Sequence, residues 1–211
     1  MANPAIVETS RPVAGVILAG GLSRRMGGGD KSLLEVGGRS MLTAVIERLE
    51  SQAQPLVLNV NGDPTRFANF HLPIVSDPID GHIGPLAGVL GGMRWAQENS
   101  TARQIVTVPA DTPFFPQDLV ERFLDGIGDA EIAIARSRGR SHPVVGLWPI
   151  EMADALEFWL RDVRHRKAET WVRSRQKVEV IFDGDGELDP FFNVNTPEDV
   201  IVAATRARKA Q

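Results

Sequence analysis

The run VAGVILAGGLSRRMGGGDKS, residues 13–32, joins an apolar segment to a basic segment that is rich in glycine. Residues 13–20 lack the alternation of a half-exposed strand, which is typical of a parallel strand covered by helices on both faces. The glycines that follow let backbone N–H groups surround a phosphate, and the arginines and the lysine neutralise its charge. The run therefore predicts a buried first strand that leads into an anion-binding loop.

The loop matches neither of two common phosphate-binding patterns. Asp30 precedes Lys31 where a P-loop has glycine, and the glycine spacing differs from the G-x-G-x-x-G of dinucleotide-binding loops. A flexible surface loop with solvated arginines is the alternative interpretation. The position of the loop directly after a buried strand favours the anion-binding role.

Short apolar runs alternate with amphipathic helical patterns along the rest of the chain. The run at residues 40–52 places its apolar side chains on one helical stripe, and Ser40 is suited to cap that helix. Further strands are predicted at residues 55–60, 72–77, 103–111, 130–135, 144–148 and 178–182, and further helices at residues 84–99, 116–127, 150–162 and from Thr196 onward. This alternation predicts a single Rossmann-like α/β domain at residues 13–208, after a flexible N-terminal segment at residues 1–12. Its sheet is expected to be mostly parallel and twisted, with helices on both faces.

The composition excludes several classes of function. The chain of 211 residues has a formal net charge of −4, which gives no overall attraction to nucleic acid. It has no cysteine, which excludes disulfides and thiolate metal sites. Residues 1–12 lack a signal-peptide pattern, and no uninterrupted apolar run reaches about 18 residues. We therefore expect a cytoplasmic protein that binds neither nucleic acid nor a membrane.

Polar or glycine-rich sequence follows each of the first four predicted strands. In an open parallel sheet, ligands bind beyond the carboxyl ends of the strands. These ends are followed by residues 18–31, residues 59–61, Asp77 and Asp111. The binding site is therefore expected where these four segments meet.

The complete opening run resembles the N-terminal signature of nucleotidyltransferases that activate sugars and other phosphates. In those enzymes L-A-G-G, R-M-G and a lysine wrap a nucleoside triphosphate, and the run here is LAGGLSRRMGGGDKSLL, residues 18–34. Within that superfamily, the chain resembles the molybdenum cofactor guanylyltransferases of the MobA type. Five later segments support this narrower resemblance: NVNGD (59–63), GPLAGVLGGM (84–93), PADTPFFPQDL (109–119), SHPVVGLW (141–148) and FFNVNTPED (191–199).

The resemblance implies transfer of GMP from GTP to the terminal phosphate of molybdopterin, normally already carrying molybdenum, with release of pyrophosphate. Because the attacking phosphate oxygen is already anionic, the reaction needs charge neutralisation and alignment rather than a strong general base. The resemblance assigns Arg25, Lys31 and Asp111 to catalysis. It also makes Asp111 the ligand of Mg²⁺, an ion that often takes one or two carboxylates together with phosphates and water. A turn or helix-cap role ahead of Thr112 is the structural alternative for Asp111.

The resemblance places the GTP site in the N-terminal part of the chain. The carboxylate of Asp77 can accept hydrogen bonds from the guanine N1–H and N2 amino group or from ribose hydroxyls, and which of these it contacts stays open. Gly20 stands where the related cytidylyltransferases tend to have alanine, and the missing methyl group leaves room for a purine. The residues implied to bind GTP are Leu18, Ala19, Gly20, Gly21, Gly28, Lys31, Asn59, Asp77 and Asp111.

The C-terminal part of the chain is implied to bind molybdopterin through His142, Asn193 and Asn195. Alternation along an extended segment puts the two asparagines on the same side. The structural alternatives are a capping role for the asparagines and a turn role for His142, which precedes a proline. The basic run at residues 164–177 is either a solvated helix face or a docking surface for the pterin phosphate or a partner enzyme.

Three other functions compete with this interpretation: a cytidylyltransferase acting on molybdopterin, a sugar-1-phosphate nucleotidyltransferase, and a nucleotide-sensing adaptor that has lost turnover. The ending NVNTPED, residues 193–199, disfavours the sugar-phosphate enzymes. The presence of Arg25, Lys31 and Asp111 disfavours an adaptor. The resemblance also suggests protein partners, namely the enzymes that insert molybdenum and the chaperones of target molybdoenzymes.

Overall fold

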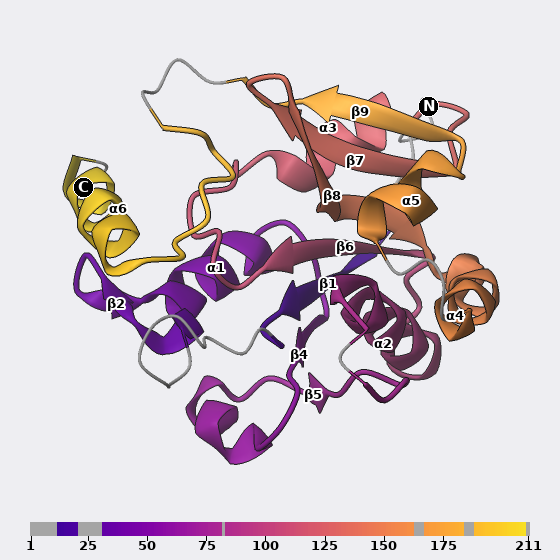
Figure 1. Cartoon of the computed structure of the whole chain (residues 1–211), viewed down its shortest axis with the longest axis horizontal. Coiled ribbons are helices and arrows are strands. Elements are labelled where there is room, and N and C mark those ends of the chain that lie inside the picture. The colour runs from indigo at the N-terminus through magenta and orange to yellow at the C-terminus, as the bar shows by residue number, and fades with distance from the viewer. Residues whose placement is uncertain (1–11, 21–30, 82, 163–166, 184–187, 210–211) are drawn as a thin grey trace, which may run out of the picture.

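β1 (Val13–Leu18) is an inner strand of the central sheet (Figure 1). It pairs in parallel with β4 (Leu56–Asn59) on one side and with β6 (Gln104–Pro109) on the other. β4 pairs in parallel with β5 (Ile74–Val75). The computed structural model describes residues 12–20, 31–81, 83–162, 167–183 and 188–209.

The other half of the sheet contains an antiparallel strand. β8 (Arg140–Pro149) runs antiparallel to both β6 and β7 (Ile132–Ser137), and β7 pairs in parallel with β9 (Lys177–Ile181). Among the described residues the strand order is β5-β4-β1-β6-β8-β7-β9, which confirms the predicted α/β sheet that is mostly parallel. β2 (Glu35–Val36) and β3 (Arg39–Ser40) form a separate small hairpin.

Helices cover both faces of the sheet, as the sequence predicts. On one face, α1 (Met41–Glu50) and α3 (Leu119–Gly126) share a buried apolar cluster with β1 and β6. On the other face, α2 (Pro85–Asn99), α4 (Ala153–Arg161) and α5 (Ala168–Arg173) pack with β1 and β8. Alternate residues of β1 belong to the two clusters because successive side chains of a strand point to opposite faces. Figure 1 shows α1 and α2 on opposite sides of β1.

Two predicted helix starts are confirmed by their capping bonds. Ser40 Oγ accepts from Thr43 N over 3.0 Å at the start of α1. At the start of α6 (Pro197–Lys209), Asp199 N donates to Thr196 Oγ1 over 3.2 Å and Thr196 N donates to Asp199 Oδ2 over 2.9 Å. These reciprocal bonds satisfy backbone N–H groups that have no partner within the helix.

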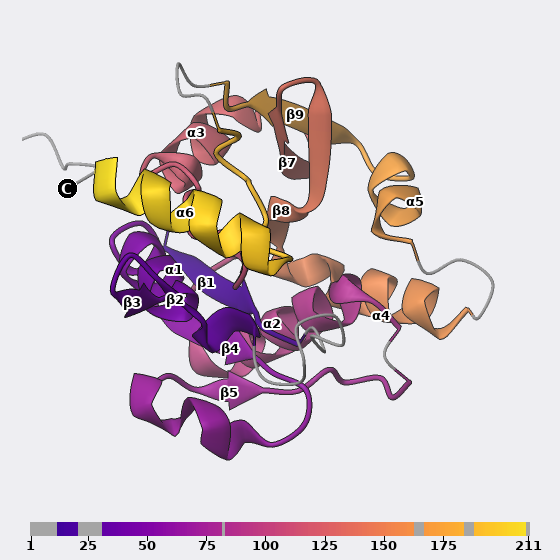
Figure 2. The ribbon, with the colours of Figure 1, turned by 60° about the vertical axis from the view of Figure 1, so that its left-hand side comes forward.

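The β2–β3 hairpin is covered by α6, which lies alongside β2 in Figures 1 and 2. The hairpin turn needs glycine, since Gly37 and Gly38 have φ angles of 67° and 87°. A side chain at Gly37 would also meet Ala207 of α6, because an added Cβ would lie 2.6 Å from its Cβ. In the part of the chain that the structure describes, three short 3₁₀ segments connect the larger elements: Lys31–Leu33, Pro64–Phe70 and Ile150–Met152.

Some predicted elements differ in extent from the observed ones. The strand predicted at residues 72–77 is reduced to β5, and the one predicted at residues 144–148 begins earlier, at Arg140, because it forms a hairpin with β7. In the basic run, Trp171 is only 2% exposed and packs on Trp159 with ring centroids 5.4 Å apart. Its ring therefore belongs to the core, which supports the solvated-helix interpretation of that run.

A charged network links side chains of β8, β7 and β9, which are neighbours in the sheet. Glu179 Oε1 accepts from Lys177 Nζ over 2.5 Å and from Ser141 Oγ over 2.8 Å, and Glu179 Oε2 accepts from Arg136 Nη1 over 2.7 Å. The hydrogen bond from Lys177, with those from Ser141 and Arg136, lowers the pKa of Glu179 to about 2.

Within the described residues, none of the helices has the length and apolar character needed to cross a membrane.

Candidate active site

The carboxyl ends of β1, β4 and β6 lie level with one another. The strand register pairs Leu18 with Asn59 on β4 and with Pro109 on β6. Backbone bonds continue this ladder past β1, because Ala19 N donates to Asn59 O over 2.9 Å and Ala110 N donates to Leu18 O over 3.0 Å. The segments that follow these strands therefore meet at one edge of the sheet, as predicted.

Asn59 and Asp77, both predicted to bind GTP, contact each other directly at this edge. Asn59 Nδ2 donates to Asp77 Oδ1 over 3.0 Å, and Asn61 Nδ2 donates to Asp77 Oδ2 over 2.7 Å. Asp77 N in turn donates to Asn61 Oδ1 over 3.2 Å. The carboxylate is thus held by two amide side chains in a fixed orientation, while Asn59 itself is only 3% exposed.

Two glycines make room for these amide side chains. A Cβ added at Gly20 would lie 2.8 Å from Asn61 Nδ2, and one added at Gly88 of α2 would lie 2.3 Å from Asn59 Oδ1. The glycine at position 20 was expected to leave space for a purine. In the structure the same space adjoins Asn61, so a side chain at position 20 would also displace Asn61.

Asp111 follows β6 and lies beside the C-terminal segment that was predicted to bind the acceptor. Thr112 Oγ1 donates to Asn193 Oδ1 over 2.8 Å, and Val194 N donates to Asp111 O over 3.0 Å. Val194 is buried whereas Asn193 and Asn195 are exposed, so the two asparagines share a side of the segment as expected. The structure therefore brings the predicted metal ligand and the predicted acceptor residues together.

His142 lies on β8 and reaches the same C-terminal segment through Ser137. His142 Nε2 lies 2.8 Å from Ser137 Oγ, which donates to Asp189 Oδ1 over 2.7 Å. Burial lowers the pKa of His142, an effect that the carboxylate of Asp189 opposes and the charge of Arg140 adds to. The imidazole is therefore neutral at neutral pH.

The remaining predicted residues cannot be placed in this geometry. Gly21, Arg25 and Gly28 lie outside the described residues, and so does the side chain of Lys31, whose backbone begins the first 3₁₀ segment. In the described part of the chain, no group of three or more His, Cys, Asp or Glu side chains is placed to hold a metal ion.

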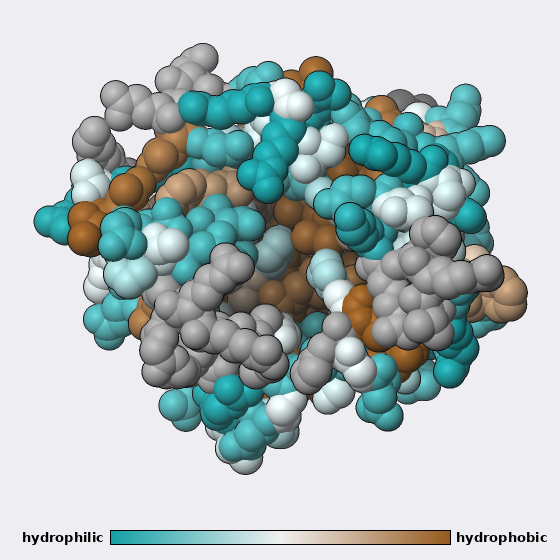
Figure 3. All heavy atoms as spheres, viewed as in Figure 1, coloured by the Kyte–Doolittle hydropathy of each residue, from teal (hydrophilic) through white to brown (hydrophobic). Residues whose placement is uncertain are grey.

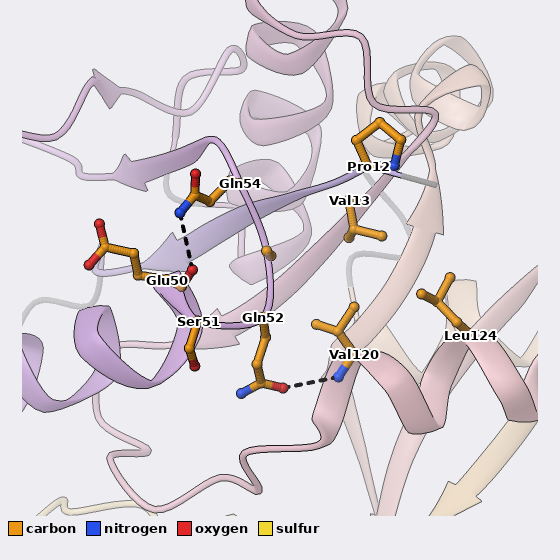
Figure 4. A pocket seen from close by; sticks show the side chains of 9 residues that line it. Pro12, Val13, Glu50, Ser51, Gln52, Gln54, Val120 and Leu124 are labelled. Carbon is orange, nitrogen blue, oxygen red and sulfur yellow. Dashed lines mark hydrogen bonds between the residues drawn. The ribbon is translucent and has the colours of Figure 1, made fainter. Parts of the chain in front are cut away.

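The face that carries these strand ends is hollowed. Figure 3 shows the hollow near the middle of the molecule, over the region where β6 ends in Figure 1, with apolar side chains at its bottom. A separate pocket of about 350 Å³ lies at the opposite end of β1, between the end of α1 and α3 (Figure 4). Its lining includes Val13, Gln52 and Val120, and among the described residues that line it Glu50 alone is charged, which does not suit a polyanion.

The fold and the strand-end site match a known family. The family described as MobA-like NTP transferase domain matches residues 15–178, which include Asn59, Asp77 and Asp111. The chain belongs to this family. It is therefore an enzyme of the nucleotidyltransferase class.

Two relatives are similar to this chain over most of their own length. A protein of Mesorhizobium japonicum named molybdenum cofactor guanylyltransferase is 46% identical over 198 residues, which cover 92% of this chain and 95% of the relative. A protein of the same name from Rhodopseudomonas palustris strain BisB5 is 49% identical over 191 residues, with coverage of 89% and 90%. The resemblance stated from the sequence is confirmed.

Solved structures confirm the fold of the MobA-like domain. Molybdopterin-guanine dinucleotide biosynthesis protein A from Archaeoglobus fulgidus has a TM-score of 0.72 at 21% identity, covering 93% of this chain and 100% of that chain. The 2-C-methyl-D-erythritol 4-phosphate cytidylyltransferase from Thermus thermophilus has a TM-score of 0.63 at 18% identity, covering 93% and 99%. At these identities, the likeness concerns the fold alone.

Four polar residues of this MobA-like site are missing from the residues predicted to bind. Asn61 could have been found, because it lies two residues after Asn59 in an extended run and therefore points the same way. Thr112 is adjacent to Asp111, but nothing in the sequence pairs it with Asn193. No local pattern of the sequence predicts the pairing of Ser137 with Asp189, because the hydrogen bond that joins them spans 52 positions.

Proposed function

We propose that this nucleotidyltransferase is a molybdenum cofactor guanylyltransferase. It transfers GMP from GTP to the terminal phosphate of molybdopterin and releases pyrophosphate. The observation that carries the proposal is the name shared by relatives that are 46% and 49% identical over 92% and 89% of the chain. The cytoplasmic location and the protein partners expected from the resemblance stay predictions.

The nucleotide is bound at the edge formed by Asn59, Asn61 and Asp77. A carboxylate has about four lone-pair positions, and the two asparagine amides occupy one on each oxygen of Asp77. The remaining positions accept from the donor groups of the guanine edge or from the ribose hydroxyls. Because the asparagines hold the carboxylate in one orientation before the nucleotide arrives, little freedom is lost on binding.

The triphosphate extends from this edge toward Asp111, and the resemblance assigns Arg25 and Lys31 to it. These two cations neutralise the phosphates, which is the main requirement when one polyanion attacks another. Asp111 would hold Mg²⁺, since a single carboxylate suits an ion that completes its shell with phosphate oxygens and water. The chemistry of the ion there is charge neutralisation on the triphosphate.

The acceptor is bound by Asn193, Asn195 and His142. Thr112 donates to the Oδ1 atom of Asn193, so the amide of Asn193 is turned with its Nδ2 protons away from Thr112. Nδ2 is the end of the amide that donates to a phosphate oxygen. Because the same segment is bonded to Asp111 through Val194, the acceptor phosphate is brought close to the carboxylate that serves the triphosphate.

The test is to incubate the protein with Mg²⁺, molybdopterin and each of the four ribonucleoside triphosphates in turn. Of the four triphosphates, we expect GTP and no other to release pyrophosphate. The same reaction should form a product whose mass is that of molybdopterin joined to GMP. Asp111→Asn should abolish the transfer and keep the fold. Asp118→Asn is the matched control, because Asp118 lies just before α3 on the loop that follows Asp111, is exposed, and forms an ion pair with Arg122 of α3 at 3.8 Å.

Each competing function has a distinct result in this assay. Consumption of CTP in place of GTP would make the protein a cytidylyltransferase. Turnover with a sugar 1-phosphate but not with molybdopterin would place it among the sugar-activating enzymes. GTP binding with no release of pyrophosphate, whichever acceptor is present, would favour the adaptor.

A further inference from the structure

Ser137, at the end of β7, is a buried polar residue that takes no direct part in the proposed reaction. Its side chain is completely buried, and its hydroxyl donates to Asp189 Oδ1 over 2.7 Å. Since the single hydroxyl proton is used on Asp189, the 2.8 Å contact with His142 Nε2 requires the imidazole to donate. We call the chain formed by Ser137, His142 and Asp189 the Ser137 relay.

The Ser137 relay holds the start of residues 189–195, which we call the acceptor arm. Asp189 Oδ1 also accepts from Phe191 N over 2.8 Å, which closes a tight turn of the Asx type. The Phe191 ring packs on the imidazole of His142, with ring centroids 4.7 Å apart. On its other side, Asp189 O accepts from Arg206 Nη1 of α6 over 3.0 Å.

The far end of the acceptor arm is held at the proposed metal site. Thr112 bonds to Asn193, and Val194 bonds to the backbone of Asp111. The arm is therefore fixed at both ends, by the Ser137 relay on the β7–β8 hairpin and by the loop after β6. The position of Asn193 between these anchors depends on both.

We propose that Ser137 is a positioning residue for the acceptor substrate: through Asp189 it sets the turn that places Asn193 and Asn195. This inference rests on the proposed function. Apolar packing between Phe191 and the hairpin could bury the arm at lower cost, because a buried polar group costs free energy unless its hydrogen bonds are made. Unlike apolar packing, the hydrogen bonds of the Ser137 relay hold the acceptor arm in one orientation. Two donors cover Asp189 Oδ1, which reduces the repulsion between this carboxylate and an anionic acceptor.

The first test compares Ser137→Ala with Ser141→Ala in steady-state GMP transfer. Ser137→Ala should raise the KM for molybdopterin about fivefold to tenfold, the effect of one lost hydrogen bond, and leave the KM for GTP within about twofold. Ser141→Ala removes a hydroxyl from the same hairpin, but its partner is Glu179 on β9, so neither KM should change. Asp189→Asn should act like Ser137→Ala, because the amide is a weaker acceptor than the carboxylate.

Two substitutions at His142 separate positioning from direct contact with the acceptor. His142→Gln places an amide near the position of Nε2 and can still donate to Ser137, whereas His142→Asn places its amide near Nδ1 and cannot. The Gln variant should therefore have a KM for molybdopterin at least about threefold below that of the Asn variant. The opposite order would overturn the proposal, because it would show that His142 serves the acceptor by direct contact through Nδ1 and not through Ser137.

Amide hydrogen exchange gives a readout that needs no turnover. Ser137→Ala should speed exchange at Phe191 N, which loses an ordered acceptor, and Ser141→Ala should not. Unchanged exchange at Phe191, an unchanged KM for molybdopterin, or an equal rise in both KM values would overturn the proposal. If the unaltered protein forms no dinucleotide at all, the proposed function fails instead, so the two failures are distinguished.

Discussion

Substitution of Gly88 by alanine should disturb the proposed nucleotide site by displacing Asn59. The new Cβ would lie 2.3 Å from Asn59 Oδ1 and 2.9 Å from Leu18 Cδ2, where ordinary contacts begin at 3.4 Å. Asn59 is buried and must move by about 1 Å to relieve the overlap, which stretches its 3.0 Å bond to Asp77 beyond hydrogen-bonding range. A hydrogen bond to a charged group contributes about 1.5–3 kcal/mol, so the affinity for GTP should fall about tenfold to a hundredfold.

Gly92→Ala is the matched control, because it lies one turn further along α2. Its new Cβ would meet the side chain of Val16 at 2.5 Å, in the core and away from the nucleotide edge. Each alanine overpacks the core at a cost of about 1–3 kcal/mol and regains about 1 kcal/mol of helix propensity, so the two variants should be destabilised alike.

Calorimetric titration with GTP and Mg²⁺, alongside thermal unfolding, separates the two effects of these substitutions. Only Gly88→Ala should lose affinity for GTP. In a background of Asn59→Ala, the Gly88→Ala change should cost no further affinity, because the clash acts through Asn59. Equal losses of affinity for both alanine variants, or full additivity with Asn59→Ala, would refute the reasoning.

Three further changes test other parts of the molecule. Thr107→Val should destabilise the fold by about 2–3 kcal/mol in urea unfolding, because the buried Trp148 Nε1 loses the acceptor that lies 2.8 Å away; the double variant with Trp148→Phe should recover part of this loss. Glu179→Gln should lower the free energy of unfolding by about 1–2 kcal/mol at pH 7. Because the pKa of Glu179 is lowered from 4.5 to about 2, this difference between the two proteins should disappear as the pH falls through that interval. Thermal unfolding of both proteins between pH 7 and pH 2 measures it. Lys31→Ala should slow GMP transfer about a hundredfold, and an unchanged kcat/KM for GTP would remove Lys31 from the site.

The convergence of the strand ends at the proposed nucleotide edge could be predicted because it depends on local patterns and one topological rule. Buried parallel strands are visible as short apolar runs, and their carboxyl ends meet at one edge whatever their order. Asn59, Asp77 and Asp111 each directly follow such a run, so their convergence required no knowledge of the helices. The bond between Asn59 and Asp77 confirms this inference for the residues that the structure describes.

The acceptor side could be predicted only in part, because its contacts depend on the path of the chain. Ser137 meets Asp189 only because β8 inserts antiparallel between β6 and β7 and because the acceptor arm then crosses back over the hairpin. Thr112 meets Asn193 across 81 positions for the same reason. No local periodicity encodes such a path. The resemblance to a family supplied the asparagines, but not the residues that hold them.

The two halves of the site are joined by backbone, and this determines what substitutions can change. Val194 N donates to Asp111 O, a bond that survives any side-chain replacement at either position except proline at residue 194. The backbone therefore keeps Val194 beside Asp111, whereas the contacts with the substrates are made by side chains such as Asp77 and Asn193. Replacing Asp77 should then alter which nucleotide is used without moving the acceptor. A variant at Asp77 that impaired GTP and molybdopterin equally would mean that the acceptor arm is held by the nucleotide edge rather than by the loop after β6.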